Sequence, residues 1–167
     1  HLLIDMITQL CVDGHKVHVI QKDTGGYLPK LPEELIKLDV TTDLIKSDLG
    51  NKRNLVGRFI SDIKYLNKCK RIISSNYDAV FLQSSNVAGY SVRILRKKLK
   101  NARITFNVQD IFPYNAYFSG KLNSIPFKML ASFQRYAYKN VDSIITISED
   151  MKELLIYDGV DEDKINV

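Results

Sequence analysis

The sequence lacks the features that define several large classes of protein. Its two cysteines, Cys11 and Cys69, form neither a CxxC pair nor a disulfide framework, so we expect both thiols to be buried and reduced. No apolar run approaches the roughly 20 residues that a helix needs to span a bilayer. The first residues also lack the basic segment and the small-residue cleavage site of a signal peptide. These absences favour a reducing, cytoplasmic setting.

Motifs for binding phosphate, metal ions or nucleic acid are missing as well. Gly25-Gly26 belongs to neither a GxGxxG nor a GKS/GKT motif, and no helical pattern directly follows it, so a flexible turn is the better interpretation. His1, His15 and His18 have no HxxxH or CxxC partner, and we therefore expect no metal site. No helix-turn-helix, RNP or zinc signature accompanies the basic residues, which argues against nucleic acid as a partner.

What is present indicates a globular protein. With 167 residues, 45% hydrophobic and 26% charged, the chain can form one sizeable core, and we expect a single domain over residues 1–167. The net charge of +5 suits an anionic partner such as a nucleotide, a phosphorylated lipid or a membrane surface, although many soluble domains carry such a charge with no partner. The basic run 93–100 is either a solvated helix face or a contact for an anionic membrane.

Helical periodicity alternates along the chain with short β-branched runs. We expect helices at 3–11, 51–75, 87–99, 125–140 and 149–158, and strands at 17–22, 78–83, 104–108, 143–147 and 164–167. Gly14 should end the first helix in a left-handed conformation. Residues 23–50 read as irregular, with a candidate edge strand at 36–41. This alternation, with continuous apolar strands, is typical of an α/β fold in which an open parallel sheet has helices on both faces. Because a parallel βαβ unit needs a strand before its helix, we expect a first strand upstream of His1.

The central strand, 104–108, runs directly into a polar and aromatic turn. In an open parallel sheet, ligands bind outside the carboxyl ends of the strands. Asp110 stands at such an end, where a carboxylate can accept a proton from a substrate hydroxyl or hydrogen-bond to it. The alternative is a loop aspartate that caps the turn before Pro113. The polar and aromatic residues of this turn are Gln109, Asp110, Pro113, Tyr114 and Asn115.

Two other strand-to-helix turns are candidates of the same kind. Ser84-Ser85-Asn86 and Ser148-Glu149 each join a strand to a helix, where hydroxyls and helix N–H groups can grip an anion or a sugar hydroxyl. A simple N-cap is the favoured alternative for both. Tyr114, Tyr117 and Phe118 form either an apolar lip that meets a sugar ring or a lipid, or a cluster that folds back on the core.

In their order along the chain, several stretches resemble a known family. The residues that carry the resemblance are 13–20 (DGHKVHVI) after the opening helix, 77–85 (YDAVFLQSS), 107–113 (NVQDIFP), 141–151 (VDSIITISEDM) and 164–167 (KINV). The third is similar to a strand-end "RDLWP" segment. Together they resemble the N-terminal half of a GT-B glycosyltransferase, most similar to family 4 bacterial enzymes of capsule, exopolysaccharide and O-antigen synthesis. Each motif alone is weak, whereas their order and spacing together are fairly specific.

The resemblance implies a Rossmann-like fold and a retaining transfer of a hexosyl or N-acetylhexosaminyl group from a nucleotide-sugar to a glycan or lipid-linked glycan. This domain would hold the acceptor and no cofactor or metal. A C-terminal domain absent from this chain would hold the nucleotide, so the isolated fragment is expected to be inactive. Gln109 stands where relatives often have Arg and Phe112 where many have Trp, which leaves the acceptor preference open. The implied catalytic residue is Asp110, the acceptor-binding residues are Ser84, Ser85, Asn86, Gln109, Pro113, Tyr114 and Asn115, and the candidate cleft-lining residues are Ser148 and Glu149.

Two other functions stay open at this point. The chain could be a non-catalytic Rossmann-like ligand-binding module, because a fold alone does not fix a function. It could also be a fragment of a nucleotide-sugar epimerase with the GT-B fold, which needs no acceptor. The basic helices and the Tyr/Phe turn further predict a peripheral position at the inner face of the cell membrane.

Overall fold

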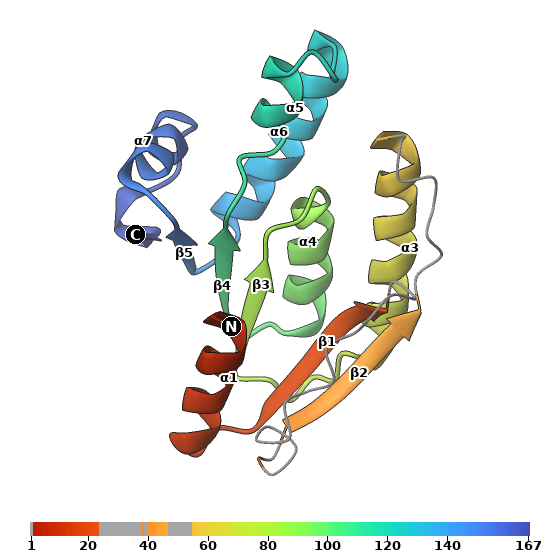
Figure 1. Cartoon of the computed structure of the whole chain (residues 1–167), viewed down its shortest axis with the longest axis vertical. Helices are drawn as coiled ribbons and strands as arrows, with labels where there is room; N and C mark the ends of the chain where they lie inside the picture. Colours follow the sequence, from red (N-terminus) through yellow and green to blue (C-terminus); the bar gives the residue numbers. More distant parts are fainter. Residues whose placement is uncertain (1, 24–37, 39, 47–54) are drawn as a thin grey trace. The chain divides into compact units, whose positions relative to one another are not determined.

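The computed structural model describes residues 2–23, 38, 40–46 and 55–167 (Figure 1). They form parallel strands covered by helices, which confirms the predicted α/β class. The chain divides into two compact units, residues 1–69 and 70–167. Each unit contains its own parallel sheet, of two strands in the first and four in the second.

The first unit is built on two parallel strands. Its elements are α1 (Leu2–Val12), β1 (Val17–Asp23), β2 (Val40–Lys46) and most of α3 (Leu55–Ile72). As predicted, α1 stops at Gly14, whose φ of 85° is a conformation that glycine adopts readily. The Lys22 ammonium lies 2.8 Å from the Asp62 carboxylate of α3 and therefore ties this helix to β1.

The edge strand of the first unit differs from its predicted position. The sequence placed a strand at 36–41, whereas β2 runs from Val40 to Lys46 and pairs with β1 from Val17↔Val40 to Asp23↔Lys46. Residues 36, 37 and 39 lie outside the described residues. The apolar signal of β2 is weak because Asp43 interrupts it, and in the structure the Asp43 carboxylate lies 2.9 Å from the His18 ring.

The second unit contains the larger sheet, in the order β3-β4-β5-β6 with every pair parallel. Its elements are β3 (Ala79–Gln83), α4 (Ala88–Lys98), β4 (Arg103–Val108), α5 (Tyr114–Phe118), α6 (Ser124–Lys139), β5 (Ser143–Thr146), α7 (Glu149–Tyr157), the 3-10 helix η1 (Glu162–Lys164) and β6 (Ile165–Asn166). The predicted helices and strands of this unit are confirmed. The short α5 was missed, because a single helical turn is too brief to show periodicity.

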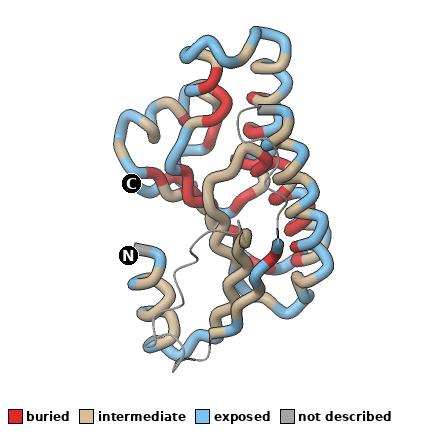
Figure 2. The backbone as a smooth tube through the Cα atoms, turned by 45° about the vertical axis from the view of Figure 1, so that its right-hand side comes forward, coloured by how far each residue is buried: buried red, intermediate tan, exposed pale blue. Residues whose placement is uncertain are grey.

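The core of the second unit lies between its sheet and the helices α4 and α6. Ile104, Phe106 and Val108 of β4 are completely buried. Figure 2 draws the buried residues of the chain in red. The Phe106 ring stacks on Tyr138 of α6, with ring centroids 5.9 Å apart. This packing explains why the strand reads as a continuous apolar run.

A glycine allows α4 and α6 to pack closely. Gly89, in the first turn of α4, is buried against α6. A Cβ atom added there would lie 2.3 Å from the backbone carbonyl oxygen of Phe133 and 2.7 Å from Cδ1 of the Phe133 ring. The ring can rotate away, but the carbonyl belongs to the backbone of α6 and can move only with that helix. Gly89 therefore sets the distance between the two helices.

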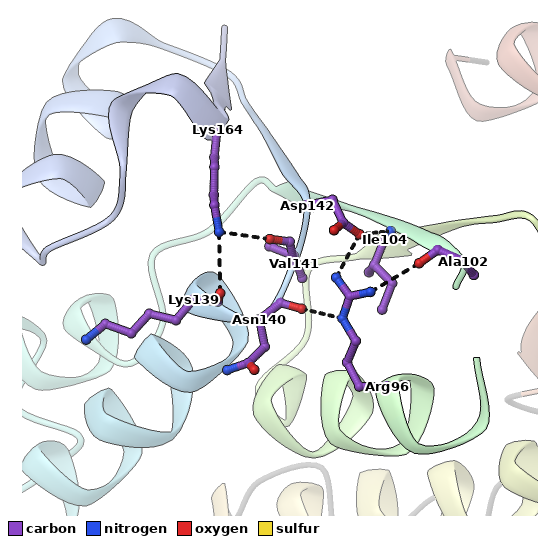
Figure 3. A network of polar contacts seen from close by, with 8 residues as sticks. All are labelled: Arg96, Ala102, Ile104, Lys139, Asn140, Val141, Asp142 and Lys164. Carbon is purple, nitrogen blue, oxygen red and sulfur yellow. Dashed lines mark hydrogen bonds and ion pairs between the residues drawn. The ribbon is translucent and has the colours of Figure 1, made fainter. Parts of the chain in front are cut away.

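At the amino end of the larger sheet, Arg96 joins three segments of chain, namely α4, the start of β4 and the turn before β5 (Figure 3). From α4, its guanidinium donates to the carbonyls of Asn140 (2.7 Å) and Ala102 (3.1 Å) and to the carboxylate of Asp142 (2.7 Å). Asp142 also accepts from the backbone N–H of Ile104 at 2.6 Å. Burial alone would raise the pKa of the Asp142 carboxyl, but the Ile104 N–H and the Arg96 guanidinium together hold it below its ordinary value.

We predict that Gly89→Ala destabilises the protein. Alanine favours a helix over glycine by about 1 kcal/mol, but the clash with the Phe133 carbonyl should outweigh this gain and lower the free energy of unfolding by about 1–3 kcal/mol. Urea unfolding measures the difference. Arg93→Ala, at an exposed position of the same helix, is the control and should change stability little. A Gly89→Ala variant as stable as the wild type would contradict the close packing of α4 against α6.

We also predict that Asp142→Asn lowers the melting temperature at pH 7. Because the folded-state pKa of Asp142 is lowered, its carboxylate stabilises the fold above the unfolded pKa of about 3.9, and this contribution is lost as pH falls through the folded value. Thermal unfolding of wild type and variant should therefore converge in acid. Asp163→Asn, which changes an exposed carboxylate of η1, should show no such convergence. A difference that does not depend on pH would refute the role of charge.

Candidate functional site

Three strand-to-helix connections leave the same end of the larger sheet. The register pairs Gln83 of β3 with Asn107 of β4, and Val108 of β4 with Thr146 of β5. Because the strands are parallel, their carboxyl ends lie level with one another, at the end toward which the arrows of β3 and β4 point in Figure 1. The connections that begin there carry Ser84-Ser85-Asn86, Gln109-Asp110 and Ser148. The structure thus brings together residues that the sequence predicted separately.

Polar side chains are buried at this carboxyl end. Asn107 donates from Nδ2 to Oε1 of Gln83 at 3.1 Å, which links β4 to β3. The Thr146 hydroxyl at the end of β5 is buried and has no hydrogen-bond partner within the described part of the chain. A buried polar group without a partner costs free energy and needs an explanation. A ligand group or a water molecule at this end of the sheet could satisfy it.

Sequence reasoning missed these buried polar residues. Asn107 was predicted only as part of the buried strand at 104–108, and Thr146 only as part of the separate strand at 143–147. The available signal was the position of a polar residue at the carboxyl end of a strand, next to last in β4 and last in β5. Such a residue in a covered parallel sheet either pairs with a neighbour, as Asn107 does, or faces the ligand end of the sheet.

Asp110 itself is exposed, in the bend between β4 and α5, and Gln109 beside it is exposed too. The bend is anchored on its far side, since Phe112 and Pro113 are both buried. The peptide bond between them is cis. An exposed carboxylate on an anchored bend can accept a hydrogen bond or a proton from a ligand hydroxyl. Pro113 lies in the core, so its part in the site is to hold the bend.

A buried carboxylate fixes the helix that follows this bend. The Tyr114 hydroxyl, at the start of α5, donates to Oδ1 of Asp158 at 2.9 Å. Arg135 of α6 donates to the same oxygen at 2.8 Å. Asp158 caps the end of α7, and its side chain is 9% exposed. Burial, and then the hydrogen bond to Asp158, raise the pKa of Tyr114 to about 12, so the hydroxyl keeps its proton at neutral pH. These bonds join α5 to α6 and α7.

The aromatic residues of the turn take both of the predicted positions. Tyr117 stacks on Phe127 of α6, with ring centroids 4.3 Å apart, and Tyr114 meets the same ring edge-on at 5.2 Å. These two tyrosines therefore fold back onto the protein. Phe118 remains exposed, and Asn115 also faces solvent.

Of the two other candidate turns, one is a helix cap: Ser148 is the N-cap of α7. Ser85 lies before α4, whose N-cap, Val87, has no side-chain cap bond, so the predicted N-cap at 84–86 is not found. The Ser85 hydroxyl accepts a hydrogen bond from the backbone N–H of Val87 at 3.1 Å, and the Ser148 hydroxyl accepts one from Met151 at 3.3 Å. Ser84 and Asn86 are half-buried, and Glu149 is exposed. The Ser85 and Ser148 hydroxyls can each form further hydrogen bonds. The predicted contacts of these turns with a ligand stay predictions.

The described residues were also searched for metal sites, membrane-spanning helices and disulfide bonds. No three His, Cys, Asp or Glu side chains in this part of the chain are placed to hold a metal ion. None of the helices described is long and apolar enough to cross a membrane. Both cysteines are free, with Cys69 buried, as predicted, and Cys11 half-buried.

The chain was compared with known protein families and with curated proteins. Residues 2–167 match the model of a protein family described as Glycosyltransferase Family 4. No curated protein matches the chain. The family match covers both compact units and every residue of the candidate site.

We predict that Tyr114→Phe lowers the free energy of unfolding by about 1–2 kcal/mol, because buried Asp158 loses a hydrogen-bond donor. The raised pKa of Tyr114 gives the effect a pH dependence. The stabilisation should be complete below the unfolded pKa of about 10 and should be lost as pH rises toward 12. Urea unfolding at pH 8 and pH 11 tests this. Tyr117→Phe is the control, because the structure gives the Tyr117 hydroxyl no hydrogen bond within the described residues. Equal effects of the two variants would contradict the prediction.

Proposed function

Because this chain belongs to Glycosyltransferase Family 4, we propose that it is the acceptor-binding part of a retaining glycosyltransferase. The enzyme moves a hexosyl or N-acetylhexosaminyl group from a nucleotide-sugar donor to a glycan or lipid-linked glycan. Its pathway is the synthesis of a bacterial capsule, exopolysaccharide or O-antigen. The observation that carries the proposal is the exposed Asp110 at an end of the sheet where three polar connections meet.

The proposed acceptor site uses groups that suit a sugar. Sugar hydroxyls both donate and accept hydrogen bonds, and the three connections offer a carboxylate, amides and hydroxyls. In the proposed mechanism, Asp110 accepts a hydrogen bond from the attacking hydroxyl of the acceptor. The hydroxyl oxygen bonds to the anomeric carbon on the face from which the nucleotide leaves, the bond from that carbon to the phosphate oxygen breaks, and the nucleotide departs as an anion. Asp110 takes the hydroxyl proton as this exchange occurs. Gln109, Ser84 and Asn86 orient the acceptor ring by hydrogen bonds. The buried Thr146 hydroxyl supplies one further partner at the same end.

The remaining parts of the reaction belong to partners of this chain. We propose that a C-terminal domain holds the nucleotide of the donor and that the residues 1–167 bind no cofactor of their own. Neutralisation of the leaving nucleotide is then a task for that second domain. An anionic membrane surface is the third proposed partner, because a lipid-linked acceptor lies at such a surface.

We predict that Asp110→Asn lowers kcat of the full-length enzyme by roughly 10²–10⁴-fold, because the amide keeps the size of the carboxylate but cannot take a proton. KM for the acceptor should change much less. Initial rates of transfer, measured from the released nucleotide, give both constants. Asp78→Asn is the matched control, since Asp78 is an exposed carboxylate beside the amino end of β3. Near wild-type turnover of Asp110→Asn would remove Asp110 from the mechanism.

A further inference from the structure

The three most exposed large apolar side chains of α5 and α6 lie at the end of α5 and in the first turns of α6. Phe118 is 81% exposed, Ile125 84% and Met129 67%. Ile125 and Met129 are four residues apart on α6 and therefore lie on the same face of that helix. The stacking of Tyr117 on Phe127 holds α5 beside α6, as Figure 1 shows. Single exposed apolar residues are ordinary, but several large ones on adjoining helices mark a site of interaction.

The charge around these side chains has one sign. From residue 111 to residue 141 the sequence contains no Asp or Glu, although the whole chain has 19 of them in 167 residues. Lys121 and Lys128 lie within this segment, and both are exposed. Lys121 separates α5 from α6, and Lys128 lies one helical turn after Ile125. We name the five residues Phe118, Lys121, Ile125, Lys128 and Met129 the α5–α6 surface.

We propose that the α5–α6 surface binds an anionic lipid bilayer. Its apolar side chains enter the headgroup region, and its two lysines meet lipid phosphates. Charge complementarity favours this occupant over a protein. A protein partner requires no local exclusion of acidic side chains, whereas an anionic bilayer repels every one of them. Large apolar side chains flanked by lysines fit the boundary between headgroups and acyl chains.

This inference rests on the proposed function for its setting, because a lipid-linked acceptor would lie in the same bilayer. Its test needs no sugar transfer. A wild-type enzyme that turns over a water-soluble acceptor but does not bind anionic vesicles would overturn the surface alone. Vesicle binding by an enzyme that transfers no sugar would overturn the proposed function alone.

The experiment is vesicle sedimentation of the full-length protein at low salt. The vesicles are phosphatidylcholine alone, or phosphatidylcholine mixed with phosphatidylglycerol. The test variant combines Phe118→Ser, Ile125→Ser and Met129→Ser, and a second variant combines Lys121→Gln and Lys128→Gln. The control combines Ile60→Ser and Tyr157→Ser, which are also exposed apolar residues but lie on α3 and α7. Circular dichroism checks that every variant is folded.

We expect the wild type to bind the anionic vesicles, to bind neutral vesicles at least tenfold more weakly, and to be released as salt rises. Each surface variant should bind the anionic vesicles at least tenfold more weakly than the wild type, and the control variant should bind equally well. The proposal is overturned if the wild type ignores anionic vesicles or if the triple serine variant binds as the wild type does. It is also overturned if the wild type is a dimer that this variant dissociates without any change in vesicle binding.

Discussion

The parallel register of β3, β4 and β5 is the constraint on which the candidate site depends. Ser84, Asp110 and Ser148 are far apart in the sequence, and no single helix, strand or turn brings any two of them together. They share one end of a sheet because parallel strands place all their carboxyl ends at that end. The register is fixed from the other end, where Arg96 and Asp142 bind α4, β4 and the turn before β5 together. A shift of one residue in the pairing of β4 would move the Asn107 side chain to the opposite face of the sheet.

The two ends of the larger sheet are therefore built differently. At the amino end, charged groups are paired with each other and with backbone groups, so their hydrogen bonds stabilise the fold. At the carboxyl end, the Asp110 carboxylate is left exposed and the buried Thr146 hydroxyl has no partner among the described residues. Polar groups that fold stability does not use are expected where a ligand binds. The chain belongs to Glycosyltransferase Family 4, and we propose that this end of the sheet binds the acceptor.

Much of the fold could be predicted from the sequence, because periodicity and caps are local properties. The strand at 104–108, the stop at Gly14 and the cap at Ser148 all follow from neighbouring residues and are confirmed. The candidate site was predicted only as a set of turns. The bonds of Tyr114 and Arg135 to Asp158 could not be predicted, because they join residues up to 44 positions apart. For the same reason the Gln83–Asn107 pair required the register.

The central claim is that the carboxyl end of the larger sheet binds the acceptor. Photo-crosslinking tests it most directly, with a diazirine-bearing glycan that the full-length enzyme accepts as a substrate, followed by mass spectrometry of the labelled peptides. The account predicts label on the connections that follow β3, β4 and β5, at residues 83–86, 107–110 and 146–149. Label concentrated at the opposite end of the sheet, around Arg96 and Asp142, would contradict it.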